Sequence, residues 1–215
     1  VYGNGIVNKG KVGITGTVKK STCIKALLYR IPEFGVYNYA CNKLFTSELF
    51  ESIRFPLGRI AEDQGTTYKL VHKAKNIYIT GTHLYNDFER EGSIARSVHS
   101  IKLLQDRMEL WIERLEFLKI HYPQFVDMQI AQILSDVYVN IVKLKKDNRN
   151  AHYIHTIYNL AKKYQYDEKK YTKYSKRVWL HYYFYPIFYI YYKYFNNWMK
   201  NNSDMTYYPR ITIVT

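Results

Sequence analysis

Two adjacent carboxylates at the start of an amphipathic stretch constrain this chain more than any other feature. Residues 54–61 form a basic segment punctuated by proline and glycine, and Glu62 and Asp63 follow it directly. Small or apolar residues then recur at helical spacing, at Thr67, Leu70, Val71 and Ala74. This pattern predicts a loop followed by a helix over 63–74, with Asp63 near the N-terminus of the helix.

Two interpretations of Asp63 follow from its place in this helix. The positive end of the helix dipole favours an ionised carboxylate there. With Arg54 and Arg59 close by in the sequence, such a carboxylate is suited to accept a proton or to bind a sugar hydroxyl. The alternative is that Asp63 is the N-cap of the helix and Glu62 is its solvated neighbour.

Four sequence blocks surround this acidic pair in a definite order. They are Tyr39-Ala40-Cys41-Asn42-Lys43-Leu44-Phe45, the segment from Glu48 to Pro56, the segment from Thr66 to Ile77, and Arg90-Glu91-Gly92-Ser93-Ile94. Their order and spacing resemble the second half of the catalytic domain of family 2 glycosyltransferases of bacterial polysaccharide synthesis, which has the GT-A fold. The resemblance covers residues 20–95, under half of the chain.

The resemblance implies an inverting transfer of a sugar from a nucleotide-sugar donor to a glycan or lipid-linked acceptor. It implies that Glu62 and Asp63 supply the catalytic base. The substrate-binding residues that it implies are Asn42, Lys43, Arg90 and Ser93. From the residues alone, Lys43 could pair with a phosphate, pair with Asp63, or be a solvated lysine beside a buried pair.

The chain also departs from the family pattern. Gln64 follows the pair where an acid is common, and Asn86-Asp87-Phe88 stand where Tyr-Tyr-Arg is common. No aspartate precedes Asp63, and the sequence contains no Asp-x-Asp metal motif. We therefore expect a fragment that lacks the N-terminal nucleotide-binding half and is inactive by itself. The Mg²⁺ or Mn²⁺ of the full enzyme would take its ligands from outside this chain, in which no metal ligand is assigned.

Charge and cysteine content bound the partners and the compartment. The net charge is +14, and residues 143–177 hold 11 lysines and arginines against 3 acids. Such a block favours anionic lipid or nucleic acid as a partner. The two cysteines form neither a disulfide framework nor a metal motif, so a reducing compartment is expected. We expect a cytoplasmic protein with contact at the inner face of the membrane.

Local patterns predict an α+β chain in two parts. Residues 1–20 favour one or two short strands, and Ser21-Thr22 are expected to cap a short helix that runs to Tyr29. Further short strands are predicted at 77–79 and 82–88, and further helices at 97–119, 124–145, 150–163 and from Asp167-Glu168 to a stop at Pro186. Residues 1–96 would be the remnant of a GT-A domain with few short strands and short helices. Residues 97–215 would be a mainly helical, aromatic and basic region.

The aromatic and basic end suggests a second class of function. Residues 164–194 hold eleven tyrosines among lysines, and Pro186 interrupts them. Because tyrosine prefers the membrane interface to the hydrocarbon centre, we reject a membrane span. The composition fits a helix on a membrane surface or a tyrosine-rich helix packed on its neighbours, with nucleic acid as the least favoured partner. The rival to glycosyl transfer is therefore a non-catalytic helical module that binds a membrane or a partner; the oligomeric state stays open.

Overall fold

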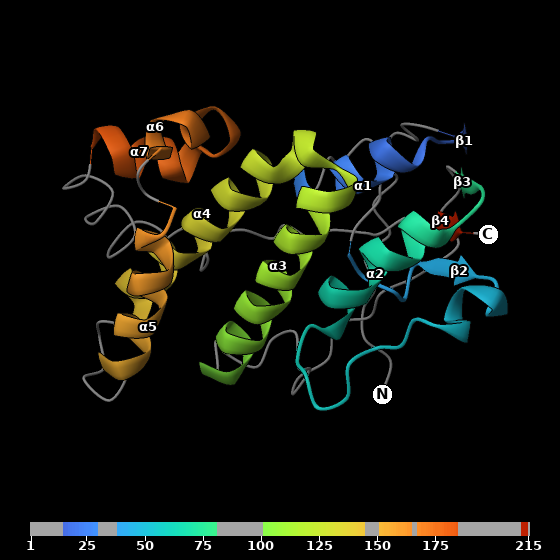
Figure 1. Cartoon of the computed structure of the whole chain (residues 1–215), viewed down its shortest axis with the longest axis horizontal. Coiled ribbons are helices and arrows are strands. Elements are labelled where there is room, and N and C mark those ends of the chain that lie inside the picture. Colours follow the sequence, from blue (N-terminus) through green and yellow to red (C-terminus); the bar gives the residue numbers. More distant parts are fainter. Residues whose placement is uncertain are drawn as a thin grey trace, which may run out of the picture. The chain divides into compact units, whose positions relative to one another are not determined.

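The computed structural model describes residues 15–29, 38–80, 101–144, 151–164, 167–184 and 212–214 (Figure 1). Helices make up most of these residues and the strands are few and short, consistent with the predicted α+β class. The chain forms two compact units, which divide between Glu116 and Phe117, and residues 206–215 belong with the first. The boundary predicted near residue 96 falls outside the described ranges.

The first unit contains a small four-stranded sheet. Its strands are β1 (Gly16–Thr17), β2 (Lys43–Phe45), β3 (Ile77–Ile79) and β4 (Thr212–Val214), in the order β1-β3-β4-β2. β3 pairs antiparallel with β1 and β4, whereas β2 and β4 are parallel. Ile77 and Ile79 are buried and Tyr78 is exposed, the alternation of a sheet with one face on the core.

Two strand predictions are confirmed, one lies outside the described residues, and one strand was missed. β3 occupies the predicted 77–79, and β1 lies within the predicted stranded region 1–20. The strand predicted over 82–88 falls on residues that the structure leaves undescribed. β4 was not predicted, and it lies in the region beyond residue 96 that was expected to be mainly helical.

Helices α1 (Lys20–Tyr29) and α2 (Glu62–Lys73) pack against each other in the first unit (Figure 1). α1 begins at Lys20, so Ser21 and Thr22 lie inside its first turn and the prediction that they cap it is wrong. α2 confirms the helix predicted over 63–74. Its buried face includes residues of the predicted helical spacing, namely Thr67, Leu70 and Val71. A short 3₁₀ helix (Ser47–Glu51) follows β2 and contacts α2.

α3 (Ile101–His121) passes from the first unit into the second and corresponds to the helix predicted over 97–119. The apolar side chains that predicted it are buried, namely Leu104, Met108, Trp111, Leu115 and Leu118. Within the first unit it lies close against α2. Gly65 of α2 faces Leu110 of α3, and a Cβ on Gly65 would overlap the Leu110 Cδ2 atom.

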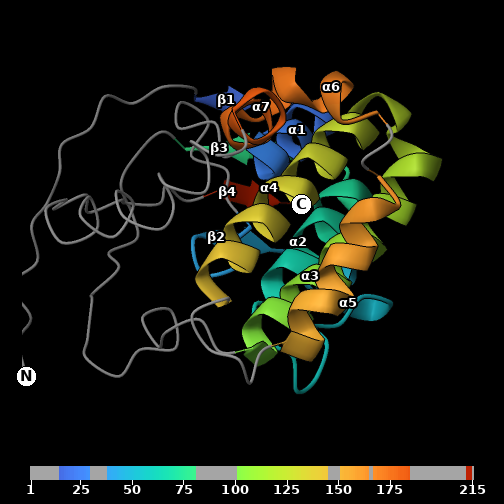
Figure 2. The same cartoon turned by 90° about the vertical axis from the view of Figure 1, so that its left-hand side faces the viewer.

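The second unit is helical, with α4 (Val126–Leu144) in contact with α5 (Ala151–Lys162), α6 (Glu168–Tyr171) and α7 (Lys176–Tyr183) (Figure 2). A 3₁₀ helix (Pro123–Phe125) precedes α4, and another (Thr172–Tyr174) lies between α6 and α7. α4 and α5 confirm the helices predicted over 124–145 and 150–163. The prediction of a single helix from Asp167 is wrong. Ser175 is extended and interrupts it, and the Ser175 side-chain oxygen accepts a hydrogen bond from the Val178 amide, which caps a new helix.

Among the described residues, no helix has the length and apolar character needed to cross a membrane.

Candidate functional site

Asp63 lies in the first turn of α2, where the sequence places it, but it is not the N-cap. The helix begins at Glu62, and the capping position is Ala61, whose left-handed backbone (φ 63°) is rare for a residue other than glycine. No side chain caps the helix. The interpretation of Asp63 as a cap is therefore wrong. Asp63 is half-buried, while Glu62 beside it is exposed.

Lys43 is buried, which overturns the interpretation of it as a solvated lysine. Its side chain comes from the first residue of β2, and the residue is only 7% exposed. The Nζ atom donates hydrogen bonds to the carbonyl oxygen of Tyr39 at 2.5 Å and to Oδ1 of Asn42 at 2.6 Å. Asn42 is itself fully buried. These contacts satisfy much of the hydrogen-bonding capacity of an amine removed from water.

Burial moves the pKa values of Lys43 and Asp63 toward each other. The pKa of Lys43 is lowered to about 7 by burial, against the raising effect of Cys41, Asp63 and Cys23. The pKa of Asp63 is raised to about 6 by burial and then by the charge of Glu62. Backbone hydrogen bonds and the charge of Lys43 lower it in part. The two groups therefore lie close enough for their charges to interact.

Two free cysteines complete the surroundings of Lys43. Cys23 of α1 is buried, and its pKa is raised to about 11 by burial, with Lys43 opposing the shift. Cys41 is exposed. Neither cysteine was predicted from the sequence to belong to the site. Cys41 stands in the same block as Lys43, which was an available signal, whereas nothing local points from Cys23 to β2.

A buried polar network holds the segment that precedes β2. The Asn38 Nδ2 atom donates to the Leu27 carbonyl of α1 at 3.1 Å, and the Thr67 hydroxyl of α2 donates to the Asn38 carbonyl at 2.6 Å. Nη1 of the buried Arg114 in α3 donates to Asn38 Oδ1 at 3.3 Å. One asparagine thus connects three helices beside Asn42 and Lys43. The sequence analysis missed this role.

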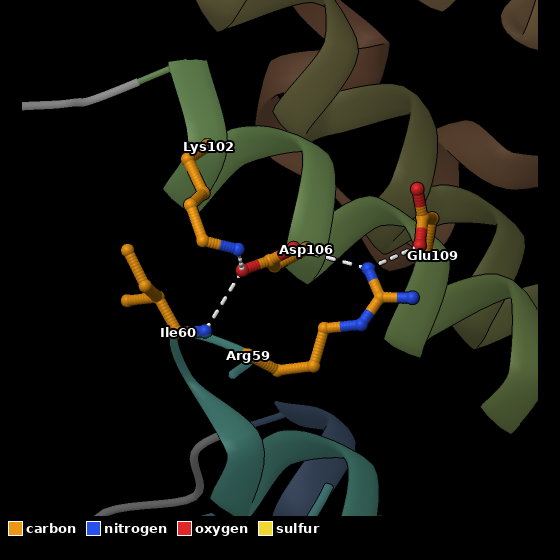
Figure 3. A network of polar contacts seen from close by, with 5 residues as sticks. All are labelled: Arg59, Ile60, Lys102, Asp106 and Glu109. Atoms are coloured by element: carbon orange, nitrogen blue, oxygen red, sulfur yellow. Dashed lines mark hydrogen bonds and ion pairs between the residues drawn. The ribbon is translucent and has the colours of Figure 1, made fainter. Parts of the chain in front are cut away.

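A second network holds the loop that leads into α2 (Figure 3). Asp106 of α3 accepts hydrogen bonds from Arg59 Nη1 at 3.0 Å, from the Ile60 amide at 2.8 Å and from Lys102 Nζ at 2.8 Å. Arg59 also forms an ion pair with Glu109. Burial acts to raise the pKa of Asp106, but these hydrogen bonds and the charge of Lys102 outweigh it and lower that pKa to about 2.

This network corrects the expectation that Arg54 and Arg59 flank the Asp63 carboxylate. Arg59 is engaged by the acids of α3. Arg54 is exposed, and its Nη1 atom donates to the adjacent Ile53 carbonyl. Arg59 holds the loop that leads into α2, and Lys43 contributes positive charge that acts on Asp63.

The structure thus brings together three of the predicted site residues, Asn42, Lys43 and Asp63, with Glu62 at their edge. Arg90 and Ser93 lie outside the described residues, and their roles stay predictions. Within the described ranges there is no group of three or more His, Cys, Asp or Glu side chains that could hold a metal ion. The described residues therefore do not fit a metal site.

Comparisons with protein-family models, with curated proteins and with solved structures find no match to this chain. The chemistry of the site consequently rests on its own residues. A half-buried carboxylate in a first helical turn, with a pKa of about 6, is ionised at neutral pH and readily takes up a proton. Those are the properties of a general base.

Proposed function

We propose that a protein carrying this chain is a glycosyltransferase of cell-surface polysaccharide synthesis, with residues 1–96 as part of a GT-A-like catalytic domain. It would transfer a sugar from a nucleotide-sugar donor to a hydroxyl group of a glycan or lipid-linked acceptor, with inversion. The observation that carries the proposal is the electrostatic interaction of Asp63 with the buried Lys43, whose Nζ atom donates a hydrogen bond to Asn42. Asn42 and Lys43 come from one sequence block and Asp63 from the acidic pair that the blocks surround, and the family resemblance names all three.

The proposed reaction is a single displacement. The ionised Asp63 carboxylate takes the proton of the acceptor hydroxyl as its oxygen attacks the anomeric carbon of the donor. A new carbon–oxygen bond forms while the bond from that carbon to the diphosphate breaks, and the nucleoside diphosphate leaves with the bonding electron pair. A base with a pKa of about 6 suits this step, because it is mostly ionised at neutral pH and retains affinity for a proton.

The surroundings of Lys43 support a role in tuning the base. Its ammonium group is buried and its Nζ atom donates to Tyr39 and Asn42, so the charge acts on Asp63 from inside the protein. Arg90 and Ser93 remain the candidates for direct contact with the substrates, with Arg90 as the cation for the leaving diphosphate. Exposed Glu62 would contribute mainly by raising the pKa of Asp63.

A divalent cation, Mg²⁺ or Mn²⁺, is expected to help the diphosphate leave. Since the described residues offer no fitting ligand set, we assign none of them to the ion. The proposed roles of this chain therefore concern the acceptor hydroxyl, its proton and the charge around Asp63.

Asp63→Asn tests the proposal directly. The whole protein that carries this chain is incubated with a panel of nucleotide sugars, Mg²⁺ or Mn²⁺ and glycan or lipid-linked acceptors, and the release of nucleoside diphosphate is measured. We expect turnover to fall ~10²–10⁴-fold, because asparagine cannot take the acceptor proton. Donor affinity should stay nearly unchanged.

The matched control is Glu62→Gln, which removes a neighbouring exposed charge and should change turnover much less.

The melting temperature of each variant shows whether a loss of turnover comes from the chemistry or from unfolding. Because the pKa of Asp63 is raised in the folded state, ionised Asp63 is a cost to folding at neutral pH, and Asp63→Asn should keep or raise the melting temperature. A variant that transfers sugar at a near-normal rate would remove Asp63 from the role of base. Absence of transfer by the unaltered protein with every donor would favour the non-catalytic binding module.

A further inference from the structure

Four large aromatic side chains lie exposed at the end of α7. Trp179, Tyr182 and Tyr183 are spaced i, i+3 and i+4, which puts them on one face of the helix, and Phe184 follows directly. They are 42–49% exposed. Their rings contact one another, with centroid distances of 5.6 Å for Trp179–Tyr183, 5.4 Å for Trp179–Phe184 and 4.8 Å for Tyr182–Tyr183. We call these four residues the α7 aromatic face.

The other side of α7 is anchored within its own unit. Val178 is fully buried, and the His181 ring stacks on Tyr138 of α4 with centroids 3.5 Å apart. The His181 Nδ1 atom is also 2.8 Å from Glu168 Oε1. With this side held by α4 and α6, the helix presents the aromatic side chains as a surface of defined orientation. Exposed large aromatic side chains grouped in this way mark an interaction site.

The charges in the segment that leads into the α7 aromatic face are mainly positive. The exposed basic side chains from 167 to 184 are Lys169, Lys170, Lys173, Lys176 and Arg177. The acids of the same segment are Asp167 and Glu168, and Glu168 is engaged by His181. Lys170 is paired with Asp127. The basic residues nearest in sequence to the aromatic face are Lys173, Lys176 and Arg177.

We propose that the α7 aromatic face docks on the interface of an anionic lipid bilayer. Tryptophan and tyrosine favour the headgroup level, where the ring is in an apolar layer and its polar atom is hydrated. The exposed lysines and arginine that precede it in the sequence complement the negative surface of anionic lipids. A helix of eight residues is far too short to span a bilayer, but it can lie in the interface. This docking is independent of the glycosyl transfer proposed above.

Vesicle flotation with the full chain tests the charge component. We expect strong binding to phosphatidylcholine vesicles that contain phosphatidylglycerol, weak binding to phosphatidylcholine alone, and release by salt. Replacing Lys173, Lys176 and Arg177 together by glutamine should weaken binding about 100-fold, since each basic side chain near an anionic surface contributes about fivefold. The matched control replaces Lys19, Lys25 and Lys75, exposed lysines of the first unit, by glutamine and changes the net charge equally. Equal losses in both variants would overturn the docking site.

A second set of variants tests the aromatic component. Replacing Trp179, Tyr182 and Tyr183 by serine should weaken vesicle binding at least about tenfold, because the buried apolar area is lost. Tyr158→Ser is the control, since Tyr158 is an exposed aromatic residue of the same unit, 45% exposed in α5. Binding within about twofold of the unaltered protein after the triple change would overturn the proposal, taking twofold as the scatter of an affinity measurement.

Tryptophan fluorescence locates the contact. Quenching by brominated lipids should be present in the unaltered chain and should be largely lost in Trp179→Phe, which keeps an aromatic ring at the site. Quenching that persists in this variant would place the contact elsewhere and overturn the assignment. Binding to single-stranded oligonucleotides without binding to anionic vesicles would also overturn it, in favour of nucleic acid.

Discussion

At the scale of single residues, Lys43 is the most unusual feature of the described chain. A buried amine is tolerated when it is hydrogen-bonded and has opposite charge nearby, and Lys43 has two acceptors and the carboxylate of Asp63. Burial still favours its neutral form, so its pKa falls to about 7. A group of this kind makes the stability of a protein depend on pH in a range where ordinary lysines do not titrate.

The pH dependence of unfolding should reveal this lysine. Between pH 7 and 10.5 the unfolded chain holds a proton on Lys43 that the folded protein releases, so stability rises with pH above about 7. The slope for one such proton is at most about 1.4 kcal/mol per pH unit. We expect Lys43→Met to lose this rise when denaturant unfolding is measured from pH 7 to pH 9. Above that range Cys23, with its pKa raised to about 11, acts in the opposite direction.

Exposed Lys75 provides the matched control for this experiment. Lys75→Met removes the same charge from the surface and should keep the rise of stability with pH. If Lys43→Met and the unaltered protein show parallel stability curves over this range, Lys43 is charged in the folded state at pH 9 and the burial argument fails.

At this scale, the residues of the candidate site could be predicted only through the order of the sequence blocks around them. Asn42, Lys43 and Asp63 could be selected because the resemblance stated in the sequence analysis implies a role for each. The burial of Lys43 could not be predicted, because it depends on which side of β2 faces the core. The ion pair of Arg59 with Asp106 could not be predicted either, because Asp106 is 47 residues away in the sequence. The apolar pattern that predicts the helix of Asp106 does not indicate which polar contacts that helix makes.

At the scale of elements, periodicity predicted most of what the structure describes. α2, α3, α4 and α5 follow from apolar side chains at helical spacing, which is local information. Helix ends were less predictable. α2 has a left-handed alanine as its cap, which no capping pattern predicts. α7 begins after an extended serine, Ser175, whose side chain caps the helix, and this capping signal in the sequence was missed.

The contact between α2 and α3 depends on a glycine. We expect Gly65→Ala to destabilise the protein by at most about 2 kcal/mol, because overpacking costs ~1–3 kcal/mol and the ~1 kcal/mol that alanine gains in a helix offsets part of this cost. Leu110→Ala alone should cost ~2–5 kcal/mol by leaving a cavity. The double variant should cost clearly less than the sum, because the new methyl group occupies space that Leu110 vacates. Denaturant unfolding of all four proteins measures this coupling, and additive effects would show that the two residues do not meet.

At the scale of the whole molecule, the strand order joins distant parts of the chain. β4 lies between β2 and β3, so residues 212–214 complete a sheet whose other strands all lie before residue 80. A parallel pair such as β2 and β4 needs a long connection, and in this chain the connection includes the whole second unit. This strand pairing could not be predicted from a local pattern. A segment of three residues after the tyrosine-rich region carries too little information to indicate which strands it pairs with.

Deletion of residues 206–215 should therefore affect the two units differently. Without β4, the strands β2 and β3 lose the neighbour between them, and each lost ladder hydrogen bond removes roughly 1 kcal/mol, so the first unit should lose about 2–4 kcal/mol of stability. Hydrogen exchange is the suitable measurement because it reports each segment separately. We expect faster exchange in Lys43–Phe45 and Ile77–Ile79, and unchanged exchange in Val126–Leu144 of the second unit. Since Lys43 starts β2, the deletion should also weaken the rise of stability with pH that Lys43 produces. Unchanged protection of both strands would mean that β4 does not hold the sheet together, whereas equal loss in α4 would mean that the units unfold as one.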